Sequence, residues 1–197
     1  MKYILFALGA LTMVIEFAIP RLIAPAYGYT MLSWTAIISV VMVSMTVGYY
    51  WGGKLTEQGE KTQMRIILFG CISSGWTVLI VLFGSSVVNI LSLPFLGILF
   101  GPLVASLLFA AIPTFLNAAV VPMVISTFRQ EAGMASGKGF SISTIGSIVG
   151  VIATGYILLP LFGIEGALLV GSGSYFFALV LYGARILGFV GLGIILE

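Results

Sequence analysis

The sequence lacks two residue types on which much enzyme chemistry depends. Its 197 residues include no histidine and no aspartate. Their absence excludes His-ligated metals, Ser-His-Asp triads and any acid–base pair built from His or Asp. The single cysteine, Cys71, lies in an apolar run and has no partner for an internal disulfide, so we expect an inert buried thiol. We predict that the chain is not an enzyme and holds neither a metal nor another cofactor.

Charge is scarce as well. Asp, Glu, Lys and Arg make up 7% of the residues, against about 25% in a soluble domain. Hydrophobic residues make up 60%, and the mean hydropathy is +1.23. A soluble fold could not cover its surface with so few charges, so lipid is the expected solvent. The net charge of +2, without a basic stripe, gives no reason to expect a nucleic-acid partner. We therefore predict an all-α integral protein of the cell membrane, with one transmembrane domain over residues 1–187.

About 20 apolar residues are needed to cross the hydrocarbon core. Six stretches meet that length, and we expect spans at 3–22, 31–52, 65–84, 103–127, 139–162 and 166–187. Residues 86–101 are apolar but interrupted by Pro and Gly, which predicts an interfacial or re-entrant segment. Residues 188–197 are expected to be a C-terminal tail, the start of a further helix, or a truncated linker. The first stretch could be mistaken for a signal peptide, but Glu16, Pro20 and Arg21 interrupt it, so we expect a retained helix.

The basic residues predict the orientation. One side of the expected membrane collects nearly all of them: Lys2, Lys54, Lys61, Arg65, Arg129, Lys138 and Arg185. Only Arg21 falls on the other side. By the positive-inside rule, both termini are predicted to be cytoplasmic.

The two halves of the chain also show a weak internal match. Glu16 precedes Pro20 in the first span, and Asn117 precedes Pro122 in the fourth. Gly48-Tyr49 late in the second span is matched by Gly155-Tyr156 late in the fifth. Repeats of three helices must have opposite orientations, which predicts a 3+3 inverted repeat of the kind found in transporters. A chance match of short stretches is the alternative.

Glu16 is the candidate for chemistry within a span. A charge inside a span costs about 2.5–3.5 kcal/mol on insertion scales, so an intramembrane carboxylate is a functional candidate by default. We group Glu16 and Asn117 with the aromatic Trp34 and Tyr27 as a hypothetical substrate site. The alternative is a hydrogen-bonded Glu16 that holds helices together. For Arg21, about 140° from Glu16 on an ideal helix, reaching the lipid headgroups is the favoured role.

The loop after the second span resembles the cytoplasmic motif of the major facilitator superfamily. Gly53, Leu55, Glu57, Gly59 and Lys61 keep its pattern. Glu57 stands where an Asp is usual, and the following Gln stands where a base is usual. The resemblance implies a charged latch between helix ends, and an ordinary charged turn is the alternative.

Glycines concentrate in the fifth span. Gly146, Gly150 and Gly155 are expected to let this helix pack closely on another. The hydroxyl residues of the same span could instead line a path.

Taken together, several stretches resemble the membrane domain of proteins in which that domain is fused to a spermidine synthase (aminopropyltransferase). They are Glu16, Arg21-Leu22-Ile23-Ala24-Pro25, Gly28, Trp34, Gly48-Tyr49, Gly52-Gly53-Lys54-Leu55, Pro122, Gly137, Ser143-Thr144-Ile145-Gly146-Ser147 and Gly155 to Gly163.

The resemblance implies a half major-facilitator-like bundle without the synthase domain, so it carries over no synthase activity. It implies transport of a cationic, polyamine-like amine or another small solute, with a homodimer as the expected assembly. The alternative is a scaffold that anchors a separate soluble aminopropyltransferase.

Overall fold

The computed structural model describes residues 2–57, 62–91, 97–128 and 131–195, and these residues form helices joined by short connections, with no strand among them. In chain order the helices are α1 (Lys2–Tyr27), α2 (Met31–Thr56), α3 (Thr62–Leu91), α4 (Gly97–Ser106), the π-helix η2 (Leu107–Ala111), α5 (Ile112–Ile125), α6 (Ala132–Ala153), the π-helix η3 (Thr154–Leu158) and α7 (Leu159–Ile195). The all-helical class predicted from the sequence is confirmed.

Five helical stretches are long and apolar enough to cross a membrane. They cover Lys2–Tyr27, Met31–Thr56, Thr62–Leu91, Leu99–Ile125 and Ala132–Arg185. The last has 54 residues and would measure about 80 Å as one straight helix, far more than a bilayer core of about 30 Å. It is not straight, because Gly163 has φ 67° and ψ −169°, which breaks the helix inside α7. The expected spans 139–162 and 166–187 are therefore parts of one long helical stretch that bends at Gly163.

Two expected segments lie at least partly within helices. The proposed interfacial segment 86–101 is split: residues 86–91 complete α3, and residues 97–101 begin α4, while 92–96 lie outside the described residues. Pro102, which directly follows this segment, is accommodated inside α4. The expected tail from residue 188 continues α7 as far as Ile195.

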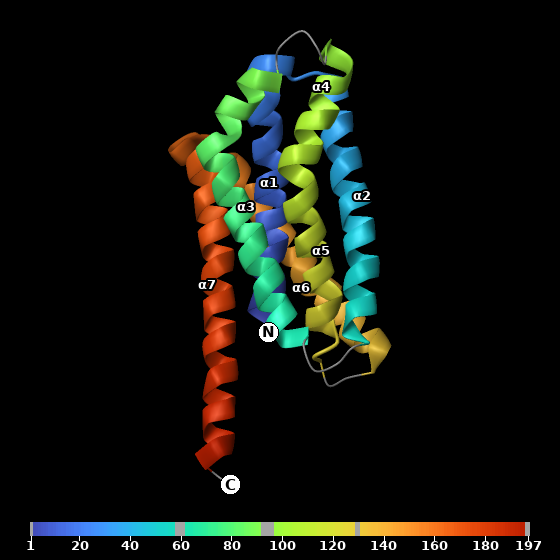
Figure 1. Cartoon of the computed structure of the whole chain (residues 1–197), viewed down its shortest axis with the longest axis vertical. Coiled ribbons are helices and arrows are strands. Elements are labelled where there is room, and N and C mark those ends of the chain that lie inside the picture. Colours follow the sequence, from blue (N-terminus) through green and yellow to red (C-terminus); the bar gives the residue numbers. More distant parts are fainter. Residues whose placement is uncertain (1, 58–61, 92–96, 129–130, 196–197) are drawn as a thin grey trace.

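The long helices run up and down beside one another, and α1 lies in the middle of the bundle (Figure 1). The start of α1 and the end of α7 lie at the same end, and α7 extends beyond its neighbours there (Figure 1). The element order brings Lys2, Lys54, Arg65, Lys138 and Arg185 toward that same end. Arg21, near the far end of α1, is the only described cation in the other half.

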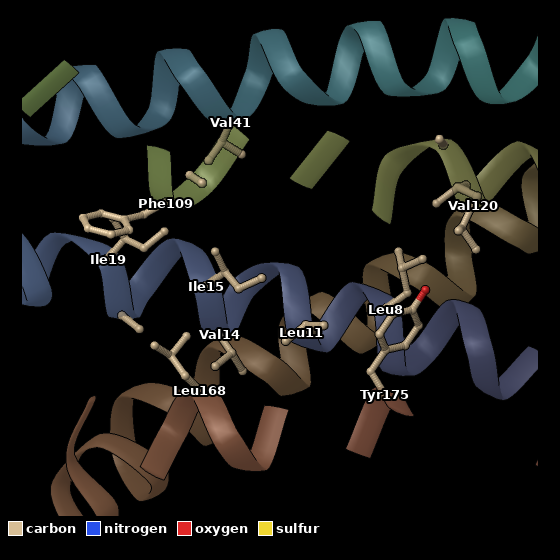
Figure 2. Packing of buried hydrophobic residues seen from close by; sticks show 14 of the residues in the cluster. Leu8, Leu11, Val14, Ile15, Ile19, Val41, Phe109, Val120, Leu168 and Tyr175 are labelled. Carbon is tan, nitrogen blue, oxygen red and sulfur yellow. The ribbon is translucent and has the colours of Figure 1, made fainter. Parts of the chain in front are cut away.

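The core surrounds α1. Figure 2 shows Ile15 and Ile19 toward Val41 of α2 and Phe109 of η2, with Leu168 of α7 on the opposite side of the helix. These side chains are at most 5% exposed, whereas α2, α3 and α7 carry many exposed large apolar residues. Burial inside and apolar exposure outside are what a helix bundle in lipid requires.

Glycines allow two pairs of helices to approach closely. On α6, a methyl group added to Gly146 would collide with the backbone of Phe6, and one added to Gly150 would collide with the backbone of Ala10. The contact positions advance by four residues in the same direction along both helices, so α1 and α6 run parallel. A β-carbon at either glycine would push the two backbones apart.

The same arrangement occurs between α2 and α5. A methyl group on Gly48 would meet the carbonyl of Phe115, and one on Gly52 would meet the backbone of Ala119. These helices also run parallel. The α1–α6 pair and the α2–α5 pair form the most extensive helix contacts in the described bundle.

Candidate functional site

Glu16 lies in the half of α1 that leads away from the N-terminus. It is about 21 Å along the helix axis from Lys2, well inside a bilayer core about 30 Å thick. Its side chain is half-buried, and no described residue forms a hydrogen bond or ion pair with it. The helix continues through Pro20, and Arg21 does not form an ion pair with Glu16. Within the described structure, the carboxyl group is therefore left to contact lipid, water or a ligand.

Asn117 is the centre of a buried polar cluster. Ser73 Oγ donates a hydrogen bond of 2.7 Å to Asn117 Oδ1, and Asn117 Nδ2 donates one of 3.5 Å to Thr12 Oγ1. Thr12 Oγ1 in turn donates to the Leu8 carbonyl at 2.9 Å. Asn117 is 1% exposed, so it faces the interior of the bundle rather than the lipid. The cluster connects α5, α3 and α1, and Thr12 lies one turn before Glu16.

The two aromatic candidates lie farther out. The Tyr27 hydroxyl donates a 2.8 Å hydrogen bond to the Leu91 carbonyl, and its ring packs tightly against Gly101. Tyr27 is eleven residues beyond Glu16, about 16 Å along the helix. Trp34 is partly buried in the first turns of α2. The structure thus brings Asn117 within one turn of Glu16, through Thr12, and leaves Tyr27 and Trp34 near the outer end of the bundle.

Thr154 is a residue that the sequence did not single out. Its hydroxyl is fully buried in η3 and has no hydrogen-bond partner among the described residues. Gly146 and Gly150 meet α1 at Phe6 and Ala10, and the same register continued along α6 brings Thr154 level with the turn that contains Glu16. π-Helical turns occur frequently at functional sites. Thr154 was one of several hydroxyl residues in the fifth span, and only the packing distinguishes it from the others.

The proposed latch is described in part. Leu55 contributes its carbonyl oxygen, which accepts a 2.9 Å hydrogen bond from Arg65 Nη1. Gly53 has open space around it, and Glu57 follows the last residue of α2. Gly59 and Lys61 lie outside the described residues. Arg65, which did not belong to the motif, is the cation that closes the C-terminal end of α2, where positive charge is favoured.

The three glycines expected to pack do not behave alike. Gly146 and Gly150 lie directly against the backbone of α1. A methyl group on Gly155, by contrast, would meet no atom within 4 Å. Gly155, which belongs to η3, is therefore not a packing glycine.

Gly155 instead lines a cavity at the bend between the last two helical segments. The cavity has a volume of about 280 Å³ and is lined by Arg21, Gly155, Leu159, Pro160, Gly163 and Ile164. Two stretches that are distant in sequence, around residue 21 and from 155 to 163, meet there. Both stretches also carry the family resemblance described above.

Among the described residues, no group of three or more His, Cys, Asp or Glu side chains could hold a metal ion. A scan against protein-family models finds no matching family, and searches of curated proteins and of solved structures find no match. The arrangement of the chain's own residues therefore carries the functional argument.

Proposed function

We propose that this protein transports a small cationic solute, with a polyamine-like amine as the substrate class. The observation that carries the proposal is Glu16: a half-buried carboxylate inside a membrane helix, without a partner in the described structure. Intramembrane carboxylates commonly mark ion and substrate paths. A cation entering the bundle must exchange its hydration for carboxylates, carbonyls or aromatic faces, and Glu16 is the group suited to this.

The helix contacts support a 3+3 inverted repeat. If the bend at Gly163 separates a fifth from a sixth span, exchanging the two halves converts the α1–α6 pair into the α5–α2 pair. The same exchange converts the contact of α1 with α7 into that of α5 with α3, and these two contacts are of similar extent. Phe6 and Ala10 then correspond to Phe115 and Ala119, each pair meeting two glycines four residues apart. Inverted repeats of this kind are typical of transporters.

The proposed assembly and membrane orientation follow from the six-span inverted repeat. Six spans form half of a major-facilitator-like transporter, so we propose a homodimer, with both termini in the cytoplasm where the basic residues collect. The substrate class rests on the resemblance to the membrane domains of spermidine synthase fusion proteins. A protein of this kind could also anchor a separate aminopropyltransferase, and the transport assay distinguishes that role.

The test is uptake of labelled spermidine into proteoliposomes that contain the wild-type protein or Glu16→Gln. We expect Glu16→Gln to fold normally and to lower uptake about tenfold or more, because it removes the charge that replaces the water around the amine. Glu165→Gln is the matched control: it removes the same charge from an exposed position in α7 and should leave uptake unchanged.

Two results would contradict parts of the proposal. Spermidine uptake that is equal in wild type and Glu16→Gln would reject Glu16 as the site. Absence of uptake of spermidine and of other small solutes, together with capture of an aminopropyltransferase by all three proteins, would replace transport with the scaffold function.

A further inference from the structure

The cavity at Arg21 lies at the level of the lipid headgroups. Arg21 is about 28 Å from Lys2 along α1, close to the thickness of a bilayer core of about 30 Å. Gly163, on the opposite wall, is about 33 Å along the helix from Arg185. Both walls therefore place the cavity at the boundary opposite to the one where most described cations collect.

Arg21 supplies the charge of this cavity. Its guanidinium forms no hydrogen bond or ion pair with any described residue. Glu165 follows a lining residue but is itself exposed and does not line the cavity. Glu16 does not line it either. A guanidinium has five N–H donors in a planar fork whose geometry matches a phosphate or a carboxylate.

The other walls are apolar or lack side chains. Leu159, Pro160 and Ile164 contribute apolar surface, and the two glycines leave room beside it. The volume of about 280 Å³ is many times the space of about 10–15 Å³ that one water molecule needs, so a phosphate group with part of its glycerol can enter. Leu161 and Phe162, which follow the lining residue Pro160, are 70% and 57% exposed, so they add apolar surface beside the cavity.

We propose that this cavity binds the phosphate of a phospholipid headgroup, with Arg21 as the ligand-binding residue. A phosphate provides the negatively charged partner that Arg21 does not have among the described residues. The apolar walls and the position at the membrane boundary favour a lipid over a free anion, because the acyl chains of a lipid can cover the exposed apolar surface beside the cavity. The inference is independent of transport, since it uses neither Glu16 nor the inverted repeat.

The experiment measures retention of phosphatidylglycerol by the full chain in a non-ionic detergent, using native mass spectrometry during lipid titration. We expect one tightly retained lipid per chain, with about tenfold weaker binding in Arg21→Gln, as the loss of a charge-assisted hydrogen bond predicts. Arg185→Gln is the matched control, because it removes the same charge at the other boundary and should not change this binding.

A second variant tests the cavity without changing charge. Gly155→Leu should fold, because an added β-carbon meets no atom within 4 Å, and it should weaken lipid binding by filling the cavity. Gly75→Leu, also at an open and exposed glycine, should bind lipid as the wild type does. Excess inorganic phosphate should leave the lipid bound.

Three results would overturn the inference. They are equal binding in wild type and Arg21→Gln, an equal loss in Arg185→Gln, and wild-type binding by Gly155→Leu. Displacement of the lipid by inorganic phosphate at equal concentration would overturn the assignment to a lipid, since a free anion would then suffice.

Discussion

The α1–α6 pair and the α2–α5 pair share the same kind of close backbone contact but differ in the residues that follow it. In each pair, two glycines four residues apart lie on the backbone of a Phe and an Ala that are also four residues apart. Beyond the glycines, α6 continues into η3, the buried Thr154 hydroxyl, the bend at Gly163 and the Arg21 cavity. Beyond Gly48 and Gly52, α2 ends at Thr56, and its partner α5 ends in the buried apolar residues Met123 and Val124.

The comparison shows that the residues responsible for close packing are not the residues that carry charge in this bundle. Both pairs are held by small residues, because helices in lipid associate through van der Waals contact rather than through a hydrophobic driving force. Among the described residues, the α1–α6 pair carries Glu16 and Arg21 beyond its close contact, whereas the α2–α5 pair carries Lys54 and Glu57 at the end of α2. Symmetric packing thus supports an asymmetric distribution of polar groups.

The largest effect should come from adding bulk to either pair. We expect Gly150→Leu and Gly52→Leu each to lower the free energy of unfolding by about 3 kcal/mol or more, since the side chain would collide with backbone that cannot rotate away. Unfolding in mixed SDS micelles, followed by tryptophan fluorescence, would measure this. Gly75→Leu, at an open glycine, is the control. A large loss in one pair and none in the other would break the equivalence of the pairs.

A smaller effect should come from the hydrogen bonds of Asn117, which connect the two pairs. Asn117→Ala removes the hydrogen bonds that join α5 to Ser73 and Thr12, and should cost about 1 kcal/mol, the usual scale inside membranes. Asn117→Ala in a Ser73→Ala background should cost less than it does alone. Additive losses in this double-mutant cycle would show that the 2.7 Å bond contributes nothing to stability.

The smallest effect concerns the ends of α2 and of the helix that follows α6. Arg65 donates to the Leu55 carbonyl at the end of α2, whereas the chain beyond α6 bends at Gly163. We expect Arg65→Gln to lower the unfolding free energy by about 0.3–1 kcal/mol, because it removes a positive charge from a helix C-terminus. The same unfolding assay applies. A loss no larger than that of Arg185→Gln, a cation in the last turns of the bundle, would argue against a specific role for the contact.

The sequence by itself determined the class of this protein. Scarce charge and long apolar runs are local properties, and they were sufficient to predict membrane helices and the position of Arg21 apart from the other described cations. Helix ends were harder to predict: residues 86–91, which were expected to belong to an interfacial segment, extend α3, and Pro102 lies inside α4. A single proline or glycine weakens a helix without ending it, because neighbouring helices and side chains can satisfy the freed backbone groups.

Only the tertiary structure decided which residues meet. The sequence matched Gly48 with Gly155, but Gly48 lies against the backbone of α5, whereas a methyl group on Gly155 would meet no atom within 4 Å. The sequence also matched Glu16 with Asn117, and the structure joins Asn117 by hydrogen bonds to Ser73 and Thr12. With 25 glycines in the chain, many small-residue pairs have the right spacing. Which of them touches a neighbouring backbone depends on the rotation and register of helices that lie more than 100 residues apart. The cavity at Arg21 arises in the same way, because the bend at Gly163 meets α1 at Arg21 only through tertiary packing.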